Sequence, residues 1–135
     1  MDYIDGFIAA VPTANRDKYL QHAEAYAEVF KECGATHYVE AWGDDVPTGK
    51  MTSFPQAVKL EPGETVVFSW VSWPSRQVRD AGMKKAMDDP RVKDAGMPFD
   101  GKRMIYGGFQ TILDSCARDR LQRAGCWASR SKLTR

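Results

Sequence analysis

The chain has 135 residues, of which 43% are hydrophobic, 11% aromatic and 27% charged, a balance that excludes a disordered or fibrous protein and indicates one globular domain. No apolar run approaches the ~18 residues of a spanning helix, and the start MDYID lacks the basic stretch of a secretory signal peptide. Three cysteines do not make a disulfide framework, so we expect a cytoplasmic protein with no membrane partner.

The first part of the chain predicts a strand, a helix and a second strand. Residues 3–11 are rich in Ile, Phe and Val without helical spacing, which is typical of a strand. Thr13 or Asn15 can cap the amphipathic helix that follows, and Gly34 supplies its left-handed stop. Residues 35–42 then predict the second strand.

The second part repeats this order. Residues 46–63 are loop-like because prolines and glycines interrupt them. Residues 65–73 predict a strand, residues 76–87 a helix capped by Ser75, and residues 102–113 the last strand. Two such halves with right-handed crossovers predict an α+β fold with βαββαβ order. This is the ferredoxin-like arrangement, a four-stranded antiparallel sheet with two helices on one face.

Basic residues are concentrated at the C-terminal end. Residues 116–135 hold six basic side chains and one acid, whereas residues 1–115 hold 13 basic and 17 acidic side chains, a net charge of −4. A basic tail can bind nucleic acid or an anionic membrane. In this tail, however, the apolar residues are scattered and do not recur at the regular spacing of an element that docks on the domain. We therefore predict a domain over residues 1–115, a tail over residues 116–135 that is disordered or foreign to it, and no nucleic-acid partner.

Helices on one face would leave the other face of the sheet uncovered. Side chains alternate along a strand, and we assign the smaller apolar set of each strand to the helices. This assignment turns Asp5 and Glu40 outward among seven aromatic residues, Tyr3, Phe7, Tyr38, Trp42, Phe68, Trp70 and Tyr106. A face this apolar predicts a partner, and a second copy of the chain is the simplest one, so we expect a homodimer.

Four segments carry a family resemblance. They are residues 5–12 (DGFIAAVP), 40–47 (EAWGDDVP), 64–75 (ETVVFSWVSWPS) and 97–109 (MPFDGKRMIYGGF). Over residues 1–115 the chain resembles the YbaA-like family of uncharacterised bacterial proteins. The resemblance implies a dimeric α/β barrel, in which two ferredoxin-like sheets pack face to face, and it implies no established reaction.

Asp5 and Glu40 are the candidate catalytic residues. A carboxylate that faces an aromatic cavity loses hydration, and its pKa then rises toward the range of a general acid or base. The candidate substrate-binding residues, as walls for a flat organic molecule, are Phe7, Trp42, Trp70 and Tyr106. The alternative is structural: a buried carboxylate pair whose members are hydrogen-bonded to Tyr, Trp or Arg side chains across the dimer, and aromatic residues that only pack in the interface.

The sequence predicts no cofactor and no metal site. His22 and His37 lack the further ligands that a metal ion needs. Asp44 and Asp45 directly precede Val-Pro, a pattern more typical of a turn than of a cation site. Two functions stay open, and with them whether the protein is an enzyme. One is a homodimer that binds or transforms a small organic molecule in a cavity on the open sheet face. The other is a non-catalytic ligand- or protein-binding dimer whose aromatic face serves only assembly.

Overall fold

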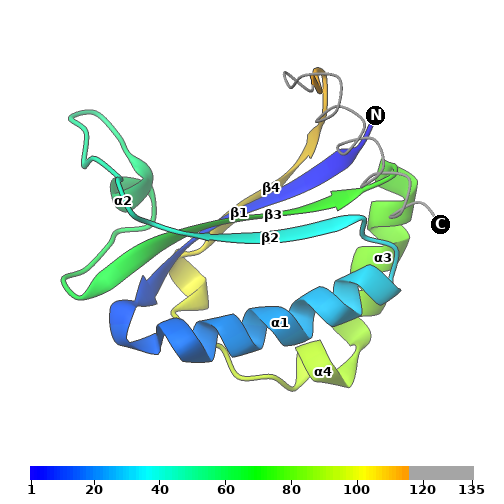
Figure 1. The fold of residues 1–135 in the computed structure, drawn as a ribbon, viewed down its shortest axis with the longest axis horizontal. Helices are drawn as coiled ribbons and strands as arrows, with labels where there is room; N and C mark the ends of the chain where they lie inside the picture. The colour runs from blue at the N-terminus through cyan, green and yellow to red at the C-terminus, as the bar shows by residue number, and fades with distance from the viewer. Residues whose placement is uncertain (116–135) are drawn as a thin grey trace, which may run out of the picture.

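The structure, a computed structural model, describes residues 1–115; the predicted tail, residues 116–135, lies outside the described part. The strands of the described part are β1 (Tyr3–Pro12), β2 (His37–Trp42), β3 (Glu64–Trp73) and β4 (Ile105–Gln110). Its α-helices are α1 (Arg16–Glu32), α2 (Phe54–Ala57), α3 (Arg76–Asp88) and α4 (Pro90–Lys93) (Figure 1). Short 3-10 turns at Thr13–Asn15 and Gly101–Arg103 precede α1 and β4.

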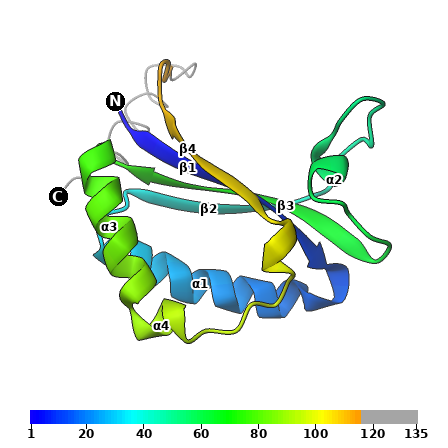
Figure 2. The same ribbon diagram turned by 180° about the vertical axis from the view of Figure 1, so that it is seen from behind.

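The four strands form one antiparallel sheet in the order β2-β3-β1-β4. The long strands β1 and β3 are central and pair over their full length. Helices α1, α3 and α4 lie on one side of the sheet (Figures 1 and 2). The predicted α+β fold, with an antiparallel sheet and its two long helices on one face, is confirmed.

The helix ends agree with the sequence in part. Helix α3 begins where predicted, because the Ser75 hydroxyl accepts a hydrogen bond from the Val78 amide at 3.2 Å. Helix α1 begins without a side-chain cap. The side chain of Asn15, a predicted cap, instead donates to the Pro98 carbonyl at 3.0 Å. Gly34, with φ +113°, ends the α1 segment in the left-handed region as predicted.

The last strand is shorter than predicted. Asp100 accepts a hydrogen bond from the Lys102 amide at 3.0 Å and thereby starts a 3-10 turn. Arg103 then pairs with Glu64 at 2.7 Å, at the beginning of β3. These polar contacts delay the strand, so β4 begins at Ile105.

The core lies between the sheet and the long helices. There the fully buried Trp73 of β3 meets Phe30 of α1 edge-on, with ring centroids 6.0 Å apart. A smaller cluster lies on the opposite side of the sheet, where Val58, fully buried, packs with Ala10 and Val66. Val58 belongs to residues 43–63, the α2 lobe, which connects β2 to β3 and rises on the side away from α1 (Figure 2). The α2 lobe therefore covers one end of the otherwise open sheet face.

Candidate functional site

The strand register places Asp5 and Glu40 on the helix-covered face. Residues paired across adjacent antiparallel strands point to the same side of the sheet. Asp5 pairs with Val71, and Glu40 pairs with Ser69, two positions away on β3. The Asp5 carboxylate accepts a hydrogen bond from Arg79 of α3, and the Glu40 carboxylate accepts one from Tyr19 of α1. Both carboxylates therefore face the helices. The prediction that they face outward is wrong.

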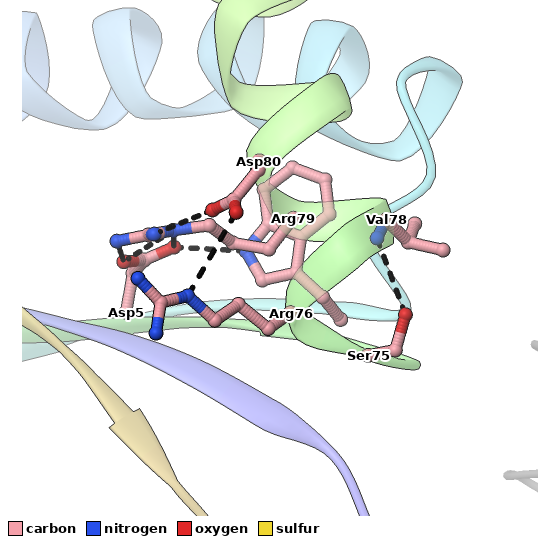
Figure 3. Close-up of polar contacts among 7 residues, drawn as sticks. Asp5, Ser75, Arg76, Val78, Arg79 and Asp80 are labelled. Atoms are coloured by element: carbon pink, nitrogen blue, oxygen red, sulfur yellow. Dashed lines mark hydrogen bonds and ion pairs between the residues drawn. The ribbon is translucent and has the colours of Figure 1, made fainter.

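Asp5 anchors β1 to α3. Its Oδ2 accepts a hydrogen bond from the Trp73 indole at 3.0 Å, and its Oδ1 accepts one from Nη2 of Arg79 at 2.8 Å (Figure 3). The Asp5 side chain is only 5% exposed and that of Arg79 22%. The hydrogen bond to Asp5 raises the pKa of Arg79, which stays a cation. With donors on both oxygens, the Asp5 carboxylate is held in place.

Glu40 forms a separate cluster between β2 and α1. The Tyr19 hydroxyl donates to its Oε2 at 2.6 Å, and the Tyr38 hydroxyl donates to its Oε1 at 3.0 Å. Burial raises the pKa of the Glu40 carboxyl, although the two hydroxyl donors oppose the shift. Strand β3 lies between β1 and β2. The structure therefore does not bring the two candidate catalytic residues together.

The orientation was mispredicted because large aromatic side chains, not small ones, pack under the helices. Trp42, for example, contacts Tyr19 of α1 with ring centroids 6.4 Å apart, and the Arg16 guanidinium lies 5.7 Å from its ring. By register, five of the seven aromatic residues predicted to face outward lie on the helix-covered face: Tyr3, Phe7, Tyr38, Trp42 and Tyr106. Phe68 and Trp70 face outward as predicted.

The open face is apolar and carries almost no charge. Its side chains are the alternate sets of the four strands, namely Ile4, Gly6, Ile8, Ala10, Pro12, His37, Val39, Ala41, Glu64, Val66, Phe68, Trp70, Ser72, Ile105, Gly107 and Phe109. Glu64, at the first position of β3 beside the α2 lobe, is the one member that is Asp, Glu, Lys or Arg, and it is paired with Arg103 at 2.7 Å. His37 on edge strand β2 is the other titratable member. Phe109 is 62% exposed and Phe68 42%. Such exposed apolar surface is typical of a binding face.

A hollow of about 620 Å³ lies on this face over β1, β3 and β4, a volume in the usual range of small-molecule sites. Its apolar lining is Ile4, Ile8, Phe68, Trp70, Ile105 and Phe109. Gly6 and Gly107 are cross-strand partners in its floor. A Cβ on either glycine would lie 3.5–3.6 Å from the Phe109 ring. A Cβ there would make ordinary contact with the ring, so only a side chain larger than that of alanine would take up space in the hollow.

The predicted substrate-binding residues are divided among different places. Trp70 lines the hollow from the open face, and Phe7 and Tyr106, whose rings stack 6.4 Å apart, also border it. Trp42 instead borders a second hollow of about 320 Å³ beside the α2 lobe, together with Asp44 and Asp45. The second hollow adjoins the first at Phe68, which borders both.

Sequence reasoning missed the isoleucines, the glycine pair and Phe109. A usable signal was present: on β1 and β2, only one of the two alternate sets contains a carboxylate, Asp5 or Glu40. An uncovered face that must meet an apolar partner does not tolerate an unpaired charge. The charge-free set is therefore the better candidate for the open face.

The described residues show no sign of a metal site or a membrane-spanning helix. Within residues 1–115, no three or more His, Cys, Asp and Glu side chains are grouped as a metal ion would require. The ring of His22 lies tilted against that of Tyr26, with ring centroids 4.1 Å apart, and burial lowers the pKa of His22. Of the helices in this described part, none is long and apolar enough to cross a membrane.

Comparison with known proteins gives a family but no activity. A family described as "Protein of unknown function (DUF1428)" matches residues 2–101. Relatives called "Uncharacterized protein YbaA" come from Escherichia coli strain K12, Escherichia coli O157:H7 and Shigella flexneri. Each is 56% identical over 116 residues, which cover 84% of this chain and 99% of the relative. The chain therefore belongs to this YbaA-like family of uncharacterised proteins.

Proposed function

We propose that the chain is a ferredoxin-like unit that forms a homodimer through its open sheet faces, and that the dimer binds a small organic molecule in the hollow between them. The observation that carries this proposal is the apolar open face, whose single acidic residue, Glu64, is paired with Arg103, together with its hollow of about 620 Å³. Asp5 and Glu40 do not border the hollow, so the proposal assigns them no chemistry there and is one of binding.

Charge supports a second copy as the occupant of the face. In a twofold dimer the same patch meets itself, and like-charge repulsion is then small for a face whose one acidic residue, Glu64, is already paired with Arg103. The chain's own tail is a poorer fit, because residues 116–135 carry six basic side chains and one acid. Burying those charges against an apolar face would cost free energy.

The shape of the face supports a cavity rather than a fully packed interface. The α2 lobe rises at one end of the open face (Figures 1 and 2), and the second hollow, of about 320 Å³, lies beside it. Two facing glycines, Gly6 and Gly107, leave the floor low beneath the Phe109 ring. Two hollowed faces that meet at their rims leave space between them, and aromatic walls suit a flat molecule.

Equilibrium dialysis with naphthalene, a flat apolar probe, tests the proposal. We expect saturable binding to the wild-type protein. Gly6→Val, which adds two methyl groups beyond the Cβ on the floor of the hollow, should abolish it while the far-ultraviolet circular dichroism is kept. Gly96→Ala is the matched control, because a Cβ there meets no atom within 4 Å. Absence of binding, or binding that Gly6→Val leaves unchanged, would contradict the proposal.

The second candidate function is assembly alone. A dimer that binds no apolar probe would favour it, since the open face would then serve only to join two copies. The exposed fraction of Phe109, 62%, is the observation in its favour, because an interface side chain is exposed in the isolated chain.

A further inference from the structure

One polar atom at the edge of the hollow has no partner. Thr111 follows β4, and its amide donates to the Asp2 carbonyl at 3.2 Å, so its backbone is held against β1. Its hydroxyl oxygen is buried and makes no hydrogen bond to any atom of residues 1–115. Thr111 also borders the hollow. A buried hydroxyl without a partner is costly, and unexplained cases in native proteins are candidates for ligand contacts.

The polar groups of the hollow are gathered on one side. Tyr106 and Gln110 also border the hollow, but by register their side chains belong to the helix-covered face, so Thr111, directly after β4, is the bordering residue whose polar side chain belongs to the open face. The floor and the opposite wall, from β1 and β3, offer Ile4, Ile8 and aromatic rings. A bound molecule would therefore have its apolar body over β1 and β3 and any polar group beside the end of β4.

The same lining restricts the charge of the molecule. No Asp, Glu, Lys, Arg or His of the described chain borders the hollow. A carboxylate, phosphate or ammonium group would lose its hydration there without a counter-ion, which is unfavourable. A neutral hydroxyl or carbonyl needs only one hydrogen-bond partner.

We propose that the hollow selects a neutral, largely apolar molecule with one hydroxyl or carbonyl oxygen, and that this oxygen forms a hydrogen bond with the Thr111 hydroxyl. The inference rests on the proposed function, because it concerns the ligand of the same hollow. Rotation about χ1 of Thr111 to another staggered rotamer moves its hydroxyl to the position now held by its methyl group or its hydrogen, and can turn the hydroxyl toward the bound molecule. A threonine hydroxyl can donate or accept, so it can serve either oxygen type.

Three probes with the same ring system test this inference: naphthalene, naphthol and naphthoate, each measured by equilibrium dialysis. One added hydrogen bond should make naphthol bind about 3- to 10-fold more tightly than naphthalene. Naphthoate should bind more weakly than both. Thr111→Val keeps the shape of the side chain and removes the hydroxyl. It should abolish the preference for naphthol and leave naphthalene binding unchanged.

Stability and a matched control complete the test. Thr111→Val should melt at the wild-type temperature or above it, because it removes an unpartnered hydroxyl. Thr48→Val, at an exposed position in the α2 lobe, should keep the naphthol preference.

Failure of the inference is distinguishable from failure of the proposed function. If naphthalene binds but naphthol has no advantage, or if Thr111→Val keeps that advantage, the inference is wrong and the hollow still binds apolar molecules. Tightest binding of naphthoate, or a destabilised Thr111→Val variant, would also overturn it. If no probe binds, the proposed function itself fails.

Discussion

Replacement of Asp5 by Asn should destabilise the folded chain. In the wild type, Arg79 donates to both carboxylate oxygens of Asp5, and the Trp73 indole donates to one of them. Asn has a single side-chain oxygen. If this oxygen accepts from the Trp73 indole, the NH2 group of Asn faces the Arg79 guanidinium, and both groups are donors. Breaking a buried ion pair costs about 3–5 kcal/mol. Arg79 is 22% exposed and keeps Asp80 at 2.9 Å, so we expect a smaller loss of stability, about 2–3 kcal/mol.

Urea denaturation followed by tryptophan fluorescence, at one fixed protein concentration, measures this loss. A double-mutant cycle with Arg79→Met should give a coupling energy of about 1–3 kcal/mol. The control is Arg76→Met on the same helix, because the Arg76–Asp80 pair is 3.8 Å apart with side chains 71% and 55% exposed; its loss should be below about 1 kcal/mol. A stable Asp5→Asn variant, or a cycle without coupling, would refute the anchoring role of Asp5.

Two further predictions concern the helix-covered side. Burial raises the folded-state pKa of Glu40 above its ordinary 4.5, so the folded chain binds that proton more tightly and loses stability as pH rises through the raised pKa. The stability of Glu40→Gln relative to wild type should therefore increase over the same window in urea titrations; parallel pH profiles would contradict this. Gly82→Ala should lower the melting temperature, although Ala favours helices, because its Cβ would lie 2.5 Å from both the Cys33 carbonyl and the Trp73 ring. Overpacking costs about 1–3 kcal/mol, and an unchanged melting temperature would show that α3 can shift away from the sheet.

Local sequence patterns predicted the element types well. The amphipathic spacing of α1, the cap at Ser75 and the β-branched and aromatic run of β3 each depend on neighbours in the chain. The antiparallel sheet with both long helices on one face follows from the order of strands and helices along the chain and from crossover handedness. Such rules need no knowledge of distant contacts, and this is why the coarse fold could be predicted.

The orientation of the strands could not be predicted in the same way. Alternation gives two sets of side chains per strand, but the choice of the inner set depends on residues far away in sequence. Asp5 faces the helices because Arg79, 74 positions later, supplies its counter-ion. Glu40 does so because Tyr19 on α1 donates to it. Assigning the smaller apolar set of each strand to the helices takes no account of such partners.

The polar side of the hollow was also beyond the sequence. Thr111 lies among residues predicted to continue the last strand, and a single threonine there has no distinguishing pattern. Only the buried position of its hydroxyl, without a partner in residues 1–115, sets it apart. The same holds for Phe109, whose proximity to Gly6 arises from the pairing of β1 with β4.

Sedimentation equilibrium at micromolar concentration is the most direct test of the central claim, that two open sheet faces pack together. The account predicts a mass of two chains of 15.2 kDa for the wild-type protein. Ile105→Lys, which places a charge on an edge strand at the open face without touching the helix-covered core, should yield a folded chain of single mass. A wild-type protein of single-chain mass, or a dimer that Ile105→Lys leaves intact, would contradict the account.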